Sequence, residues 1–277
     1  MLPIVLAAVS ALAFGTADFA GGKASRHADP IAVTVLSQIL SVPLLLVLVL
    51  VVPGSPTPPD LGWGLVAGVA GAGGVMLLYR ALATGVMAVV APITAVTAAI
   101  VPIVAGLVIA NSPGAVALGG AGLAVVAIGL VSLGERGGTG RTSGRVVGTA
   151  LAAGLLFGVF FALLGQADEA AGMWPVLAVR VSSVAFGLAL AARIGTRLRL
   201  PRRLWGWAAT AGLLDSAANA LFLAAAGRGH LSVVAAVASL YPASTVLLAL
   251  AVDRERLRPV QLAGLGFAAA ALVLASV

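Results

Sequence analysis

Charged side chains inside long apolar stretches are the residues of this chain best suited to chemistry. Asp215 lies in the otherwise uncharged stretch 204–227, and Arg180 lies in the otherwise uncharged stretch 170–192. A charge in such surroundings is costly, so each residue is a functional candidate by default. A buried carboxylate can bind and release a proton, and a guanidinium can bind the carboxylate or phosphate of a substrate.

Asp215 is the strongest of these candidates for a substrate or proton site. Asn219 follows it by four residues, which places both side chains on one face of a helix. Together they offer a hydrogen-bond acceptor and an amide to a polar site, although a contact that only orients helices fits equally well. Arg180 has three interpretations: pairing with Asp215, contact with a substrate, or a long stem that reaches the membrane surface.

Three further polar residues belong to the candidate set. Asp18, near the end of the first apolar stretch, is a substrate or proton candidate, but the sequence favours an ion pair with Lys23 or Arg26. Gln38 is a weaker candidate in the second stretch. Glu255 lies in a polar turn, where we expect a structural role, capping the last helix or pairing with arginines at helix ends.

Catalysis at a metal or cofactor is not predicted. The chain has no cysteine, its two histidines lack neighbours at ligand spacing, and no nucleophile–base arrangement is visible. We therefore predict no catalytic residues, no metal, no cofactor and no enzyme activity.

The elements that must position the candidate residues are transmembrane helices. The 277 residues are 61% hydrophobic and 9% charged, with a mean hydropathy of +1.15, too few charges for a soluble surface. In lipid the backbone must satisfy its own hydrogen bonds, so we expect all-α spans of ~20 residues. Turn residues separate ten such spans, at 3–21, 31–52, 61–82, 86–110, 115–133, 146–165, 173–192, 204–226, 231–252 and 259–277.

The ten spans fall into two similar halves. Residues 67–68 match 211–212 at an offset of 144, and this offset holds without a gap over three helices. The first helices correspond at an offset of 143, through residues 14–15 and 157–158. The matches indicate an internal repeat.

An odd number of spans in each half predicts that the second half is inverted. Secondary transporters use this inverted-repeat plan, with the substrate site near the membrane midplane between the repeats. We expect a first five-helix repeat over residues 1–134, a linker over 135–145 and a second five-helix repeat over 146–277. Alternating access would then come from rocking one repeat against the other.

The basic residues are divided unequally between the two sides of the membrane. Loops after the odd-numbered spans hold 14 of the 16 lysines and arginines, the opposite loops hold Arg228, and Arg180 is inside a span. The positive-inside rule predicts that the basic side is cytoplasmic and that both termini are outside. This distribution accounts for the formal charge of +7, so no nucleic-acid partner is predicted.

Three prolines inside predicted spans are candidates for gating. Pro92 and Pro102 in the fourth span and Pro242 in the ninth remove backbone hydrogen bonds and should kink these helices. A kink serves as a hinge or frees a carbonyl for a substrate, and a static bend is an equally good interpretation.

Motifs near the end of the chain are typical of one family of membrane proteins. They are a Tyr-Pro pair at 241–242, DRERL at 253–257 and PVQLAG at 259–264. The first repeat departs from this pattern, because Asn111 occupies the position equivalent to Glu255. With these motifs the chain resembles the EamA-type branch of the drug/metabolite transporter superfamily, over essentially its whole length.

The resemblance implies a ten-helix transporter of small metabolites with a central cavity in a multi-pass protein of the cell membrane. Export of an amino acid, a related metabolite or a drug-like compound is the family-level expectation. The partners would be a small-molecule substrate, the lipid bilayer and, if transport is coupled, protons, with a monomer and a homodimer both acceptable. Many members keep both termini in the cytoplasm, whereas the arginine count here argues for the reverse.

Other functions remain as alternatives. A channel or ion carrier should show a polar pore-lining stripe or a filter-like loop, and neither is evident. A membrane enzyme would need a polar catalytic cluster at the interface. A structural membrane protein is also compatible with the composition, although the inverted repeat argues for alternating access.

Overall fold

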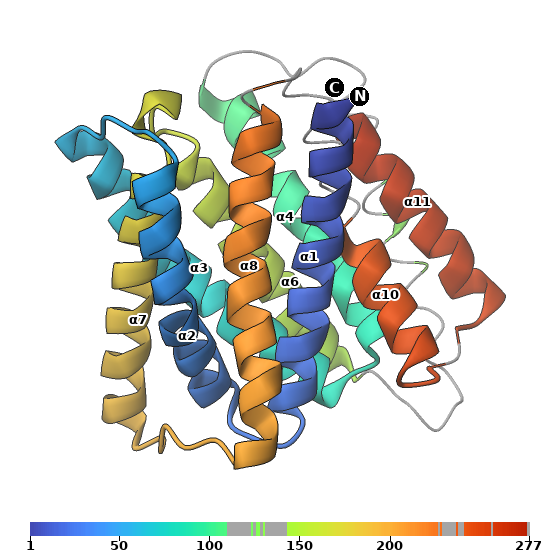
Figure 1. Cartoon of the computed structure of the whole chain (residues 1–277). Coiled ribbons are helices and arrows are strands. Elements are labelled where there is room, and N and C mark those ends of the chain that lie inside the picture. The colour runs from blue at the N-terminus through green and yellow to red at the C-terminus, as the bar shows by residue number, and fades with distance from the viewer. Residues whose placement is uncertain are drawn as a thin grey trace.

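The computed structural model describes residues 1–109, 123, 126–127, 130, 143–226, 228, 237, 241–255 and 257–275. Within these residues the chain forms nine α-helices, named as in Figure 1, and two short 3-10 turns, η1 (Glu169–Ala171) and η2 (Arg202–Leu204). The helices are α1 (Leu2–Ser25), α2 (Pro30–Val51), α3 (Pro58–Thr84), α4 (Met87–Ile109), α6 (Gly144–Leu164), α7 (Trp174–Ile194), α8 (Trp205–Ala226), α10 (Tyr241–Ala251) and α11 (Pro259–Ala275).

The helices follow the predicted apolar spans closely. Six of them are long and apolar enough to cross a membrane: α1, α2, α3, α6, α7 and the segment Arg202–Ala225 that contains α8. The predicted span 115–133 and the first part of the span 231–252 lie outside the described residues, apart from isolated positions. The prediction of an all-α membrane protein is confirmed, and the number of ten spans stays a prediction.

Local sequence signals set the helix starts. Asp29 caps α2 by accepting a hydrogen bond from the backbone N–H of Ile31 at 2.8 Å, and Pro30 occupies the first turn. Thr57 and Asp60 form a reciprocal capping box at the start of α3.

The three candidate prolines do not interrupt any described helix. Helix α4 is continuous from Met87 to Ile109 and contains both Pro92 and Pro102, and Pro242 is the second residue of α10 as described. A gating role for these prolines therefore stays a prediction.

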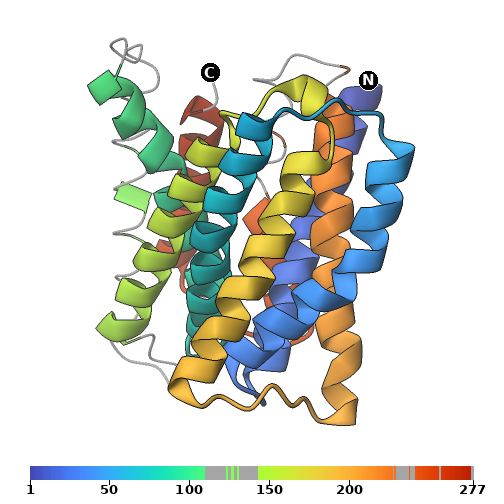
Figure 2. The same cartoon turned by 90° about the vertical axis from the view of Figure 1, so that its left-hand side faces the viewer.

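The two sequence halves are interleaved. Helix α1 packs mainly against α8, α2 packs against α8 and α7, and α4 packs against α6. Helix α3 lies between α6 and α7, as Figure 2 shows. Most of the described packing thus joins a helix of the first half to a helix of the second.

Glycines make the close helix approaches possible. A Cβ on Gly68 of α3 would overlap the backbone oxygen of Val179 in α7, and the hydroxyl of Ser183 donates to the Gly68 carbonyl at 2.8 Å. A Cβ on Gly212 of α8 would overlap the carbonyl of Ser37 in α2. Small residues at helix contacts are typical of membrane proteins, where close backbone packing drives association.

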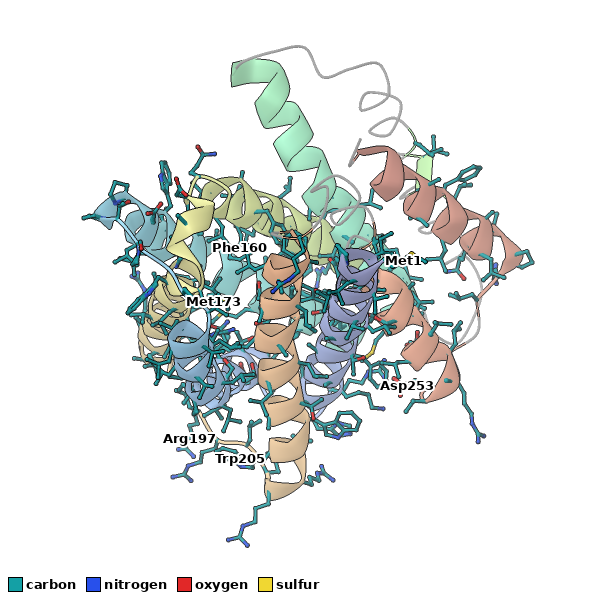
Figure 3. The ribbon with its side chains drawn as sticks, turned by 45° about the horizontal axis from the view of Figure 1, so that its top comes forward. Met1, Phe160, Met173, Arg197, Trp205 and Asp253 are labelled. Atoms are coloured by element: carbon teal, nitrogen blue, oxygen red, sulfur yellow. The ribbon has the colours of Figure 1, made fainter. Side chains whose placement is uncertain are left out.

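The two ends of the bundle differ in charge. The chain starts at one end, where α11 also finishes, and the ends of α1, α3, α7 and α10 lie at the opposite end (Figure 1). Figure 3 shows Arg197 and Trp205 at that opposite end, in the connection from α7 to α8 and at the start of α8. The described basic residues in these helix ends and connections are Lys23, Arg26, Arg80, Arg145, Arg193, Arg197, Arg199, Arg202, Arg203, Arg254 and Arg258. We call this end the basic end.

Candidate functional site

The centre of the candidate site is an ion pair between α7 and α8. A terminal guanidinium nitrogen of Arg180, Nη2, lies 2.7 Å from Oδ2 of Asp215 and also donates to the hydroxyl of Ser216 at 3.2 Å. Arg180 is buried at 6% exposure, whereas its neighbour Val181 is 58% exposed. Of the three interpretations of Arg180, the structure therefore shows pairing with Asp215, and the side chain does not reach the membrane surface.

Asp215 remains accessible from inside the bundle. Its side chain keeps 37% of its surface exposed although it lies at the middle of α8. Leu213, about 200° away round the helix, is 40% exposed and marks the outward face. The accessible part of the Asp215 carboxylate therefore points away from that face, toward α7 and the neighbouring helices.

Asp18 is the second carboxylate of the site. It lies on α1, partly buried, within electrostatic range of Asp215. The structure gives it no hydrogen bond or ion pair among the described residues. The expected pairing with Lys23 or Arg26 is wrong, because both basic side chains reach Asp253 of the α10–α11 turn instead. Asp18 is thus an acceptor without a protein partner in the described part of the chain.

Asn219 and Gln38 take less central positions. The side-chain nitrogen of Asn219 donates at 2.8 Å to the backbone carbonyl of Asp215 within α8, so this donor is directed to the helix backbone. Gln38 of α2 is 5% exposed, and its side-chain oxygen is buried without a hydrogen-bond partner in the described structure.

Tyr79 is a member of the site that sequence reasoning missed. It lies near the end of α3, yet it is only 4% exposed. Its ring packs directly on Gly21 of α1, and its hydroxyl lies within electrostatic range of Asp18, Asp215 and Arg180. The available signal was the Gly21-Gly22 pair, which leaves room for a large side chain from a neighbouring helix.

Two aromatic rings lie beside Asp18 on the side of α10. Tyr241 is within electrostatic range of Asp18, and its ring meets that of Phe14 edge to face with centroids 6.2 Å apart. Phe14 precedes Asp18 by one helical turn on α1. The site therefore combines carboxylates, one guanidinium and aromatic surface from helices of both halves.

Glu255 has the expected structural role: it pairs with Arg26 at the end of α1, but the helix that it caps is α4 and not the last helix. Its two carboxylate oxygens accept hydrogen bonds from the backbone N–H groups of Met87 and Ala88, each at 3.0 Å, and Arg26 lies 3.2 Å away. Glu255 thus caps α4, where the free N–H groups and the helix dipole favour a negative charge. The start of α11 is instead capped by Gln261, whose side-chain oxygen accepts from the Arg258 N–H at 2.9 Å.

A comparison with protein families identifies the chain. The family model described as the EamA-like transporter family matches residues 1–133 and again residues 145–277. The chain belongs to the EamA-like transporter family. A search of curated proteins found no match.

Family membership confirms several predictions. The chain is a multi-pass membrane protein of a transporter family and not of an enzyme family, and two copies of the family model cover it. A small-molecule substrate and a membrane setting follow from this membership. Among the described residues no group of three or more histidines and carboxylates is placed to hold a metal ion.

Proposed function

We propose that this protein is a secondary transporter that exports a small zwitterionic metabolite, such as an amino acid, by alternating access. The single observation that carries the proposal is the polar site of Asp18, Arg180 and Asp215 among apolar helices of both halves. Polar groups at such depth in a membrane protein mark substrate or ion pathways. The repeated family match and the odd number of predicted spans in each half support ten helices in two inverted repeats.

The free hydrogen-bonding groups of the site fit a zwitterion. Nε of Arg180 is a buried donor without a hydrogen-bond partner among the described residues. The Asp18 carboxylate likewise has no hydrogen bond or ion pair in the described part of the chain. A substrate carboxylate would accept from the guanidinium, and a substrate ammonium group would be neutralised by Asp18. The rings of Phe14 and Tyr241 add a face that also attracts an ammonium group.

Proton coupling belongs to the same proposal. Asp18 is a carboxylate among apolar helices without a protein partner in the described part of the chain, and such a group can bind and release a proton. A proton bound there would be released when a cationic group binds. Such exchange would link transport to the proton gradient.

The interleaved packing changes the expected motion. Because α1 packs mainly on α8 and α3 packs on α6 and α7, rocking one sequence half as a rigid body would break most helix contacts. The moving groups therefore contain helices from both halves. Alternating access around Asp215 then requires that the helix contacts between these groups, each with helices from both halves, break and form again.

Metabolite profiling of cells and medium tests the function. We expect a small molecule enriched outside cells that express the wild type, and not outside cells with Asp215→Asn or an empty vector. Asp29→Asn is the matched control, because asparagine also caps helices well and Asp29 lies outside the site. Equal extracellular profiles in all strains, or a solute-independent ion conductance in proteoliposomes, would contradict the proposal.

A further inference from the structure

The two ends of the bundle can be compared through the internal repeat. The offset of 144 residues, or 143 in the first helix, makes α1 and α3 equivalent to α6 and α8. Helices α1 and α3 both finish at the basic end, and α6 and α8 finish at the opposite end (Figure 1). If the two repeats had the same conformation, the contact between α1 and α3 at the basic end would have its equivalent between α6 and α8 at the opposite end.

At the basic end α1 and α3 are in contact. A Cβ on Gly22 would lie 2.8 Å from Cβ of Leu82 and 3.0 Å from the terminal methyl of Met87. Tyr79, one turn earlier on α3, packs on Gly21, the preceding residue of α1, and is 4% exposed. These contacts close the space between the two helices.

The equivalent contact is absent at the opposite end of the described structure. A Cβ on Gly165, the equivalent of Gly22, would meet only carbonyl oxygens of α6, the helix that it terminates. Leu223, the equivalent of Tyr79, is 37% exposed. Helices α6 and α8 do not form a packed pair in the described residues as α1 and α3 do.

A cluster of charges links three segments at the basic end. Lys23 and Arg26 of α1 each lie 2.5 Å from a carboxylate oxygen of Asp253, which follows α10 (Figure 3). Arg26 also lies 3.2 Å from Glu255, which in turn caps α4. We call Lys23, Arg26, Asp253 and Glu255 the basic-end latch. It ties α1 to the α10–α11 turn and to the start of α4.

The opposite end has no equivalent of the latch in its sequence. The offset of 143 relates Lys23 to Gln166 and Arg26 to Glu169, and the offset of 144 relates Asp253 to Ile109 and Glu255 to Asn111. No basic–acidic pair exists among these four equivalents. Ion pairs therefore hold the basic end together, and the equivalent positions of the repeat provide no such ion pairs at the opposite end.

We propose that the basic-end latch is a gate of the transport path, and that the structure is the conformation closed at the basic end. This proposal depends on the alternating access proposed above. For a substrate to pass the basic end, Lys23 and Arg26 must separate from Asp253. The paired side chains keep 6–25% of their surface exposed, so water reaches them when they part.

Cysteine pairs test which end is closed, and the chain is suited to this because it has no cysteine of its own. Oxidation should link Gly22→Cys to Leu82→Cys, since the two Cβ atoms would lie 2.8 Å apart and a small outward shift of the helices brings them into the disulfide range of about 3.5–4.5 Å. The symmetry-equivalent pair Gly165→Cys with Ala226→Cys is the matched control and should stay reduced. Linking of both pairs at equal rates, or of the control pair alone, would overturn the assigned conformation.

Accessibility tests the latch itself. Ser25 is 6% exposed at the end of α1, and its hydroxyl is buried without a hydrogen-bond partner in the described structure, so Ser25→Cys should be tolerated. In protein reconstituted in vesicles, adding Asp253→Asn should raise labelling of this cysteine by a membrane-impermeant maleimide at least several-fold. Arg254→Gln removes a charge from the same turn, where Arg254 makes no ion pair with a described residue, and should leave the rate unchanged.

The labelling assay separates the gate from the proposed function. Labelling does not depend on transport. If Asp253→Asn raises the labelling rate but no transport is found, the proposed function is contradicted and the opening of the latch is still supported. Unchanged labelling in Asp253→Asn, with normal insertion and transport, would show that the latch only stabilises the fold and would overturn the gate.

Discussion

The unequal burial of Arg180 and Asp215 predicts unequal costs when their ion pair is broken. Asp215→Ala leaves a guanidinium whose side chain is 7% exposed, and an uncompensated buried charge costs about 3 kcal/mol or more. Arg180→Met keeps the apolar stem and leaves a carboxylate that is 37% exposed. Since this carboxylate keeps part of its hydration, we expect a loss of about 1 kcal/mol.

Thermal unfolding in detergent measures this difference through the fluorescence of the four tryptophans. For a chain of this size about 1 kcal/mol corresponds to a shift of about 2–4 °C, so Asp215→Ala should lower the apparent Tm by about 6–12 °C and Arg180→Met by about 2–4 °C. One scan rate must be used throughout, because membrane-protein unfolding is often irreversible.

The double variant Arg180→Met/Asp215→Ala is the internal control for this experiment. It removes both charges, so it should be more stable than Asp215→Ala alone, as expected for two groups that interact directly. If Arg180→Met proves as destabilising as Asp215→Ala, or if the two losses simply add, the reasoning from burial is wrong.

Four further variants test other parts of the structure. Tyr79→Phe removes the hydroxyl near Asp18 and Asp215, which also hydrogen-bonds the Ser37 side chain. Transport should fall, and the lost hydrogen bond should cost about 1 kcal/mol of stability; unchanged transport would exclude Tyr79 from the site. Gly212→Ala forces α8 away from α2 and should cost about 1–3 kcal/mol, whereas Gly148→Ala, which meets no neighbouring atom, should be neutral or stabilising. A reporter fused after Val277 should be active outside the cell, and cytoplasmic activity would reverse the orientation.

The helices could be predicted because hydropathy and turn residues act locally. Apolar runs bounded by Gly, Pro and Ser fixed the spans that became α1 to α4, and the Asp29-Pro30 start of α2 is a local capping signal. The pairing of Arg180 with Asp215 was one of three interpretations. Their depth in the membrane suggested contact, but depth alone says nothing about which way each helix faces.

The latch and Tyr79 could not be predicted because they depend on long-range packing. Lys23 and Arg26 find Asp253 across 230 and 227 residues of sequence, although Asp18 lies only five residues from Lys23. On a helix that spacing places Asp18 and Lys23 on different faces. Similarly, Tyr79 enters the interior only because Gly21 of another helix leaves space for its ring.

The interleaving of the halves has a consequence for how the protein is made. The ribosome delivers α1, α2 and α3 to the membrane before α6, α7 and α8 exist. The glycine face of α3 at Gly68 and the face of α1 that packs on α8 then have only lipid beside them. The first half therefore waits in the bilayer with only its own contacts, such as that of α1 with α3, and the second half supplies most of the remaining helix packing when it arrives. Insertion and folding are in this sense two successive events, separated by the time needed to synthesise the rest of the chain.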